Sequence, residues 1–467
     1  MNFASFTALE ISDAVRTGRV TAREITEAAL SRIAETHAQL NAFTLVTAER
    51  ARQEASAVDA AVAAGRLAGP LAGVPYGVKN LFDLAGEVTV AGSKINRDNA
   101  PAAEDATAVD RLRRAGAICL GALNMGEYAY DFVTENAHDG PTRNPRDLTR
   151  SAGGSSGGSG AAVAAGLVPF ALGTDTNGSI RVPASFCGIW GLKPTYGRLS
   201  RAGSFPFVDS LDHIGPFANS VADLAAVYDA MQGPDPRDPA CSLRSPDLAH
   251  STLETEPRAI RVGIATGYFE KSCPPQARSA VAAVAAALGG AQRIEIAETA
   301  CARARTAAYL ITMAEGGQLH LPRLRNRAAD FDPGTRDRFI AGALLPAAWY
   351  LQAQRYRSWW REQMREVFRQ VDLLLAPATP VPATALGQQT MTLEGQEMLV
   401  RPNLGIFTQP ISFVGLPVVA APVHSAGPLP IGVQLIGAPW SEALLLRVAR
   451  SLEKSGVCTA PIAAVAA

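Results

Sequence analysis

Two serine-bearing turns are the stretches of this chain whose residue types and spacing could support chemistry. Residues 151–160 contain only Ser, Ala and Gly, and residues 173–180 read Gly-Thr-Asp-Thr-Asn-Gly-Ser-Ile. Because glycine has no Cβ, backbone N–H groups in such turns can approach a ligand closely. Ser179 directly follows Gly178, so the second turn could combine a nucleophile with the convergent N–H groups of an oxyanion hole.

Two other interpretations of the glycine turns carry less weight. A flexible Gly/Ser linker would not be flanked by apolar helix and strand patterns, whereas these turns are. A phosphate-binding loop needs Lys and Ser or Thr directly after its last glycine. Here Gly160 is followed by Ala161 and Ala162. The pattern therefore favours a nucleophilic site.

A serine nucleophile needs a base, and Lys79 is the candidate. It lies in the otherwise apolar stretch 74–82. Such a lysine either snorkels to the surface or is desolvated, which lowers its pKa and makes it a base near neutral pH. The serine turns favour the second alternative. A Ser-His-Asp arrangement stays open but unsupported, because the six histidines lie outside both turns; His138 and His213 are the nearest in sequence.

Residues around the nucleophile are expected to bind the oxyanion and the substrate. The expected oxyanion donors are the backbone N–H groups of Thr176, Asn177, Gly178 and Ser179. The polar, aromatic segment 124–140 supplies the substrate-binding candidates Ala129 and Tyr130.

Four charged or aromatic residues near these turns have other expected roles. Asp175 and Arg181 flank the nucleophile and are interpreted as a buried structural pair. Glu127 and Tyr128 either line a pocket or cap a helix.

The elements that must position these groups follow from periodicity. Residues 8–63 read as helices, with a capping box that starts at Thr21. Residues 71–83 predict a short buried strand and a turn that carry Lys79, and residues 161–172 predict a helix and a strand between the two serine turns. Strand patterns recur at 371–377, 418–422 and 431–436, and a helix pattern closes the chain at 442–454. We divide the chain into an N-terminal helical region, 1–65, and a catalytic domain, 66–467, with a largely helical insertion around 299–370.

Composition excludes several classes of protein. The chain has 43 basic and 43 acidic side chains, so no nucleic-acid partner is expected. No apolar run reaches the length of a membrane span, and the N-terminus lacks a secretory pattern. The six cysteines are scattered singly, which argues against a metal site or a disulfide framework. We expect a cytoplasmic enzyme without a metal or organic cofactor.

These stretches resemble the amidase signature family of hydrolases. The resemblance rests on GGSSGGSG at 153–160 and GTDTNGSIRVPA at 173–184, joined by GVPYGVKNLFD at 73–83, GLPVVAAP at 415–422 and LPIGVQLIG at 429–437. They occur in family order and cover nearly the whole chain. The resemblance implies an α/β amidase signature fold, with a central mixed twisted β-sheet covered by helices on both faces.

The resemblance also implies a catalytic triad of Lys79, Ser155 and Ser179. Ser179 would be the nucleophile, and Ser155, on a cis peptide, would bridge it to Lys79. Hydrolysis would then pass through an acyl-enzyme. One departure from the family pattern is Asn177, where the family usually has glycine. Asn tolerates left-handed backbone geometry, so it is either a neutral replacement or a contact to a polar, urea-like substrate.

Three segments resemble one branch of the family, which hydrolyses 1-carboxybiuret-type substrates. They lie at 176–201, 315–333 and 344–357. In that branch the large subunit pairs with a small helical subunit. We therefore expect a serine amidohydrolase that releases ammonia from a small polar, biuret-like amide. The alternatives are the amidase subunit of a tRNA-dependent amidotransferase, a general small-amide or carbamate amidase, and a non-catalytic assembly subunit.

Segments 8–63 and 341–368 are the candidates for subunit contacts. The first has more amphipathic helix than a hydrolase core requires, and the second combines aromatic residues with arginines, as interface cores do. We expect a homodimer, or a heterotetramer with the small helical subunit. Ordinary packing over the sheet is the alternative.

Overall fold

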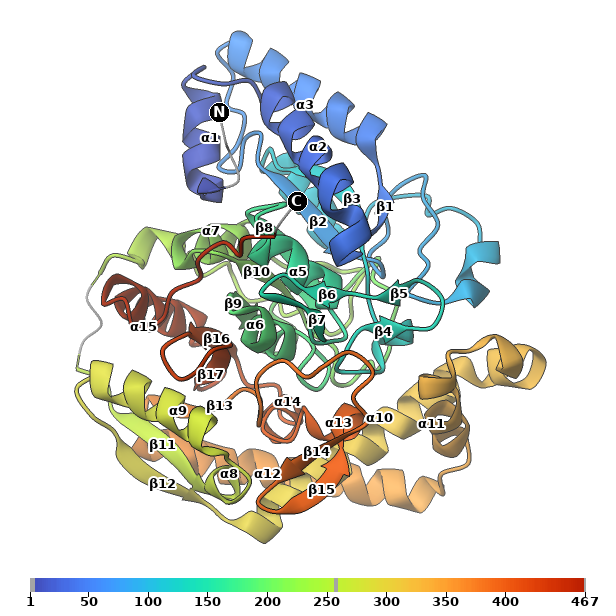
Figure 1. Cartoon of the computed structure of the whole chain (residues 1–467), viewed down its shortest axis with the longest axis vertical. Coiled ribbons are helices and arrows are strands. Elements are labelled where there is room, and N and C mark those ends of the chain that lie inside the picture. Colours follow the sequence, from blue (N-terminus) through green and yellow to red (C-terminus); the bar gives the residue numbers. More distant parts are fainter. Residues whose placement is uncertain (1–4, 256–258, 466–467) are drawn as a thin grey trace.

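A single large sheet organises the chain. The computed structural model describes residues 5–255 and 259–465. Those residues form one eleven-stranded sheet in the order β1-β3-β2-β8-β10-β9-β16-β17-β13-β11-β12 (Figure 1). Its strands are β1 (Phe43–Val46), β2 (Pro75–Lys79), β3 (Ile118–Leu123), β8 (Phe170–Thr174), β9 (Trp190–Lys193), β10 (Ile214–Ala218), β11 (Val262–Gly267), β12 (Gln292–Ile296), β13 (Leu373–Pro377), β16 (Val418–Val423) and β17 (Ile431–Ile436).

The sheet is mixed, as predicted. Strand β2 runs parallel to β3 and β8, and β11 runs parallel to β12 and β13, whereas the pairs in the middle of the sheet are antiparallel. Strands β3, β8, β9, β10, β13, β16 and β17 are buried at every position. A strand buried on both sides needs a covering layer on each face. The α/β class with helices on both faces is therefore confirmed.

The helices come from all parts of the chain. They are α1 (Ala8–Arg16), α2 (Ala22–Leu40), α3 (Ala48–Ala63), α4 (Thr107–Arg114), α5 (Gly157–Ala164), α6 (Arg181–Cys187), α7 (Val221–Met231), α8 (Tyr268–Lys271), α9 (Pro275–Ala287), α10 (Glu298–Arg327), α11 (Pro333–Ala343), α12 (Ala347–Gln370), α13 (Val400–Asn403), α14 (Gln409–Ser412) and α15 (Glu442–Lys454). Within the described ranges, none of them is long and apolar enough to cross a bilayer.

Small two-stranded sheets lie outside the central one. They are built from β4 (Glu135–Asn136) with β5 (Gly140–Pro141), β6 (Arg143–Asn144) with β7 (Asp147–Ser151), and β14 (Thr390–Leu393) with β15 (Gln396–Leu399).

The N-terminal segment agrees with the prediction except at one strand. The capping box at Thr21 is present, with its side chain accepting from the Glu24 N–H and the Glu24 carboxylate accepting from the Thr21 N–H. The prediction of helix throughout 8–63 is wrong at β1. Asn41 adopts a left-handed conformation that ends α2, and the β-prone sequence Phe-Thr-Leu-Val that follows pairs with β3 as an edge strand.

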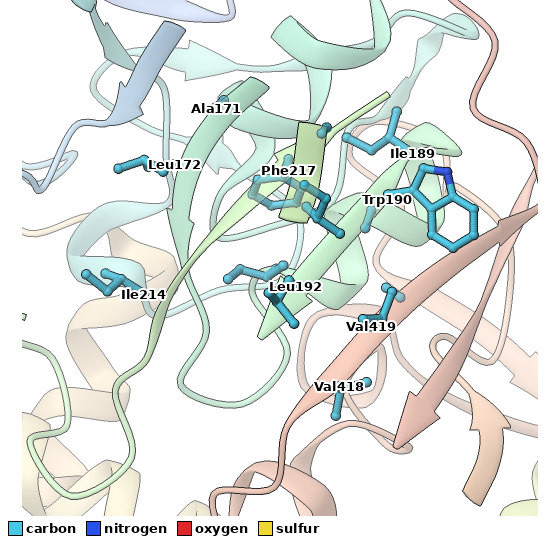
Figure 2. Close-up of a cluster of buried hydrophobic side chains, with 14 of the residues drawn as sticks. Ala171, Leu172, Ile189, Trp190, Leu192, Ile214, Phe217, Val418 and Val419 are labelled. Atoms are coloured by element: carbon cyan, nitrogen blue, oxygen red, sulfur yellow. The ribbon is translucent and has the colours of Figure 1, made fainter. Parts of the chain in front are cut away.

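The core beneath the turn that carries Ser179 is built from the middle strands. Figure 2 shows Leu172 of β8, Trp190 of β9, Phe217 of β10 and Val419 of β16 within one buried cluster. This packing fixes β8, which leads directly into the turn that carries Ser179. The position of that turn therefore depends on the core of the sheet.

Parallel pairing brings Lys79 and the turn that carries Ser179 together. In the β2–β8 pair, Tyr76 faces Phe170 and Val78 faces Leu172. Lys79 ends β2 and Thr174 ends β8. Because parallel strands end at the same edge of a sheet, both residues emerge beside each other.

Candidate active site

Lys79 is held in a fully buried polar contact with Ser155. Its Nζ lies 2.7 Å from Ser155 Oγ and 2.8 Å from Thr174 Oγ1, and the lysine has no exposed surface. Burial lowers the pKa of Lys79 to about 7, although the more distant charges of Asp131, Asp212 and Asp175 oppose that shift. The buried alternative is therefore correct, and snorkelling is excluded.

The two contacts of Lys79 suit a neutral amine. An ammonium group has three N–H donors, whereas a neutral amine has two donors and one lone pair. Thr174 Oγ1 can accept one N–H, and the lone pair can then accept the Ser155 hydroxyl proton. No carboxylate among the described residues forms an ion pair with Lys79, so the lysine is not held in its charged form.

Ser155 lies at a close approach between two loops. The Gly154–Ser155 peptide bond is cis, as the family resemblance implies. A Cβ on Gly154 would lie only 2.5 Å from the Val133 N and 2.6 Å from Asp131 Oδ1, so glycine is required there. The second link of the expected relay is absent from the described residues, where no hydrogen bond joins Ser155 Oγ to Ser179 Oγ.

The turn that carries Ser179 presents a run of free backbone donors. In the described chain, the N–H groups of residues 176–179 have no hydrogen-bond partner, although these residues are almost fully buried. The next two N–H groups, of Ile180 and Arg181, donate to the Asp175 carboxylate. Buried backbone donors are rarely left unpaired. This geometry supports an oxyanion site at residues 176–179.

Gly178 is the residue that the backbone of this turn demands. Its φ is +144°, and a Cβ there would overlap Thr408 Oγ1. Asn177 does not adopt a left-handed conformation. The expectation that position 177 needs a residue that tolerates left-handed geometry is therefore wrong.

A buried ion pair anchors the same turn, as predicted. Arg181 Nη2 lies 2.8 Å from Asp175 Oδ1, and both side chains are fully buried. Arg181 also donates to Gln434 Oε1 at 2.7 Å and to the Thr408 carbonyl at 3.1 Å. Burial alone would raise the pKa of Asp175, but the charge and hydrogen bonds of Arg181 outweigh it and hold that pKa well below its usual range.

A pocket opens beside Ser179. The pocket brings together five of the residues singled out from the sequence, namely Ala129, Tyr130, Thr176, Asn177 and Ser179. Lys79, Ser155 and Gly178 are not among its lining residues. Lys79 and Ser155 therefore lie outside the pocket lining, and Lys79 contacts the turn that carries Ser179 at Thr174.

Several pocket residues carried no signal in the sequence. They are Asp131, Phe132, Phe207, Tyr309, Thr312, Arg338, Pro402 and Gln409. Arg338, on α11, donates to the carbonyls of Tyr130 and Gly334, and its guanidinium lies 4.0 Å from the centre of the Tyr130 ring. None of the ion pairs formed within the described ranges includes Arg338. It is thus a cation at the pocket wall without an acidic partner there.

Glu127 and Tyr128 do not line this pocket. The buried Glu127 carboxylate accepts hydrogen bonds from Ser93, from the N–H of Asp332 and from Thr335. Asp332 is the N-cap of α11, so Glu127 attaches the start of this helix to segment 124–140. The helix-capping alternative describes Glu127 better than the pocket alternative.

The histidines offer no second base. No histidine of the described chain lines the pocket or bonds to Ser179. His138 Nε2 contacts Glu127, and the Nδ1 atom of buried His213 faces the carbonyls of Asp175 and Leu211. Burial lowers the pKa of His213 well below its ordinary value. Residues 5–255 and 259–465 also contain no cluster of His, Cys, Asp and Glu side chains that could hold a metal ion.

Comparison with known proteins gives consistent results. A family model described as Amidase matches residues 24–446. The chain is 53% identical to AtzE, a 1-carboxybiuret hydrolase subunit of Pseudomonas sp. (strain ADP), over 96% of this chain and 98% of that protein. It is 39% identical to a glutamyl-tRNA(Gln) amidotransferase subunit of Roseiflexus sp. (strain RS-1), over 95% and 94% of the two chains.

Solved structures show the same relationship in three dimensions. One, described as "An unexpected vestigial protein complex reveals the evolutionary origins of an s-triazine catabolic enzyme", superposes with a TM-score of 0.95 at 52% identity, over 97% of this chain and 99% of that chain. A bacterial aryl acylamidase of the amidase signature family superposes with a TM-score of 0.88 at 27% identity, over 97% and 96% of the two chains.

Proposed function

Because this chain belongs to the amidase family, we propose that it is a serine amidohydrolase for a small urea-like substrate of the 1-carboxybiuret type. The observation that carries the proposal is the buried Lys79–Ser155 contact of 2.7 Å beside a turn with free backbone donors. A scaffold subunit would need neither feature.

The reaction begins with proton transfer toward Lys79. Neutral Lys79 takes the hydroxyl proton of Ser155, and Ser155 takes that of Ser179, whose oxygen attacks the substrate carbonyl. The N–H groups of residues 176–179 hold the resulting oxyanion. The C–N bond then breaks as the leaving nitrogen accepts a proton from Ser155, which Lys79 reprotonates. Ammonia leaves and the acyl group stays on Ser179.

Water completes the cycle. With Lys79 neutral again, Ser155 takes a proton from a water molecule, which attacks the acyl-Ser179 ester. The second oxyanion collapses, the acid product leaves and the Ser179 hydroxyl is restored. The protein's own residues account for every proton transfer in this scheme.

The charges at the pocket favour an anionic substrate. Arg338 has no acidic partner among the described residues and keeps Nη1 free of protein hydrogen bonds there. Asp131 lies near Ser155, with its Oδ1 close to Gly154. Arg338 would attract a substrate carboxylate and Asp131 would repel it, which favours binding with the carboxylate toward Arg338 and away from Asp131. This supports the carboxybiuret type, which the relative AtzE carries in its name.

The tRNA-dependent amidotransferase alternative receives less support. Relatives of that name are 37–40% identical to this chain, against 53% for the carboxybiuret hydrolase relative. The balance of 43 basic and 43 acidic side chains also gives no general attraction for RNA.

A partner protein is part of the proposal. Helices α11 and α12 and the short connection between them expose the large apolar side chains of Ile340, Leu344, Trp349, Leu351 and Trp359. Segment 8–63 offers only Val46 of this kind in the described chain, because its helices bury their apolar faces in the core. We therefore place the subunit contact on α11 and α12, with a small helical subunit or a second copy of this chain. Light scattering, with and without co-expression of a short neighbouring gene, tests this; a fully active monomer would contradict it.

An ammonia-release screen tests the function. The substrates are 1-carboxybiuret, biuret, allophanate, a carbamate and simple amides. We expect the highest kcat/KM for 1-carboxybiuret. In Arg338→Met, KM should rise for the anionic substrates and stay near the wild-type value for neutral biuret. Arg336→Met, on an exposed side chain of the same helix paired with Asp337, is the matched control. Preference for a simple amide, or equal effects of Arg338→Met on both substrate types, would contradict the proposal.

A further inference from the structure

The side chain of Asn177 is held in one orientation. Its Nδ2 donates to Thr312 Oγ1 at 2.9 Å, and the Thr312 hydroxyl donates to the Ala308 carbonyl at 2.9 Å. Because the Thr312 proton is used, its oxygen can only accept from Asn177. The amide nitrogen of Asn177 therefore faces Thr312, and the amide oxygen faces away from it.

That amide oxygen is buried without a partner. In the described chain, Asn177 Oδ1 has no hydrogen bond, and the residue is only 7% exposed. A buried acceptor left unpaired is costly and calls for a functional explanation. Both Asn177 and Thr312 line the pocket that contains Ser179. A ligand in that pocket can therefore supply the missing donor.

Nothing in the turn itself requires asparagine. Its backbone is not left-handed, and its carbonyl accepts from Thr408 Oγ1 at 2.6 Å whatever the side chain is. The neighbouring Asp131 adds a second acceptor with weak protein contacts, a 3.3 Å bond from the Thr134 N–H and a 3.8 Å ion pair with Arg401. The pocket near Ser179 is thus rich in acceptors.

We propose that Asn177 Oδ1 accepts a hydrogen bond from the substrate N–H that lies next to the scissile carbonyl. Asn177 would then select ureido substrates, which carry nitrogen at that position, over amides that carry carbon there. This inference rests on the proposed function and adds a specificity-determining residue to it. A site built to bond an N–H group discriminates strongly against an analogue that lacks it, because its own acceptor is then left unpaired.

Biuret and malonamide form the test pair, because malonamide has CH2 where biuret has its central N–H. The measurement is the ratio of kcat/KM values for ammonia release from the two compounds. Asn177→Gly should lower the biuret/malonamide ratio about 10- to 100-fold. Asn177→Asp keeps an acceptor oxygen and should keep the ratio within about threefold of wild type. Thr312→Val, which frees the amide to rotate, should give an intermediate ratio.

Binding separates this inference from the proposed function. Kd values for both compounds are measured calorimetrically in the Ser179→Ala background, with and without Asn177→Gly. Failure of the wild-type enzyme to hydrolyse both 1-carboxybiuret and biuret would contradict the proposed function, but the Kd ratio would still test Asn177. A biuret/malonamide ratio that Asn177→Gly leaves unchanged, in turnover or in binding, would overturn the inference, and a collapsed ratio would support it.

Discussion

The protonation of Lys79 should set the acid side of the pH–rate profile. Burial lowers its pKa to about 7, and only the neutral amine can accept the proton of Ser155. About half of the enzyme is then active at pH 7 and about 1% at pH 5. The value of kcat/KM should therefore fall about 50-fold from pH 7 to pH 5 and rise about twofold from pH 7 to pH 9.

The assay is ammonia release from biuret, which does not titrate across this range, at substrate concentrations well below KM. A second lysine makes a control necessary. Lys193 is also fully buried, burial lowers its pKa to about 7 as well, and it donates to the carbonyls of Pro194 and Leu416 rather than to a serine. Lys193→Met should keep the midpoint near pH 7, because Lys193 contacts neither Ser155 nor Ser179.

Two results would refute this reasoning. One is a profile that stays flat between pH 5 and pH 8 in the wild-type enzyme. The other is disappearance of the fall in kcat/KM toward pH 5 in Lys193→Met, which would assign the titration to Lys193 instead of Lys79.

Two substitutions test the energetics of the site. Lys79→Met should abolish turnover yet stabilise the fold by about 1–3 kcal/mol at pH 6. Lys79 loses its proton near the ordinary pKa of 10.5 in the unfolded chain but near 7 in the folded chain, so the charged lysine opposes folding most strongly below pH 7 and ceases to do so above pH 10.5. Urea unfolding at pH 6 and pH 10 measures this stabilisation, and equal stabilities of the two proteins at pH 6 would contradict it. Gly178→Ala should destabilise the fold by about 1–3 kcal/mol and remove activity, because the added methyl group meets Thr408 Oγ1. The control is Gly456→Ala, which is also at positive φ but has open space around it, and it should keep full activity. An active Gly178→Ala enzyme would contradict the prediction.

The sequence was informative where the signal is local. Ser179 lies within a glycine turn of unusual composition, and Lys79 is conspicuous in an apolar run, so their types and neighbours made them candidates. Ser155 became a candidate only through the family resemblance, because its turn holds several serines. The parallel pairing of β2 with β8 then explains why Lys79 and Thr174 meet. Strand β1 was missed because its four residues are too short to show a period between two long helices.

The substrate side of the pocket could not be predicted in the same way. Thr312 and Arg338 come from α10 and α11, where helical periodicity indicates packing and says nothing about which side chain faces a site in another part of the chain. The orientation of Asn177 depends on Thr312, and the attachment of α11 depends on Glu127. Such long-range contacts are set by tertiary packing.

Turnover by Ser179→Ala tests the central claim most directly. Ser179 Oγ makes no hydrogen bond within the described residues, so its removal should leave the melting temperature and the Kd for biuret nearly unchanged. Ammonia release should fall by at least about 10⁴-fold, as for other enzymes that lose their nucleophile. A folded Ser179→Ala protein that binds biuret and turns it over within tenfold of the wild-type rate would contradict the account.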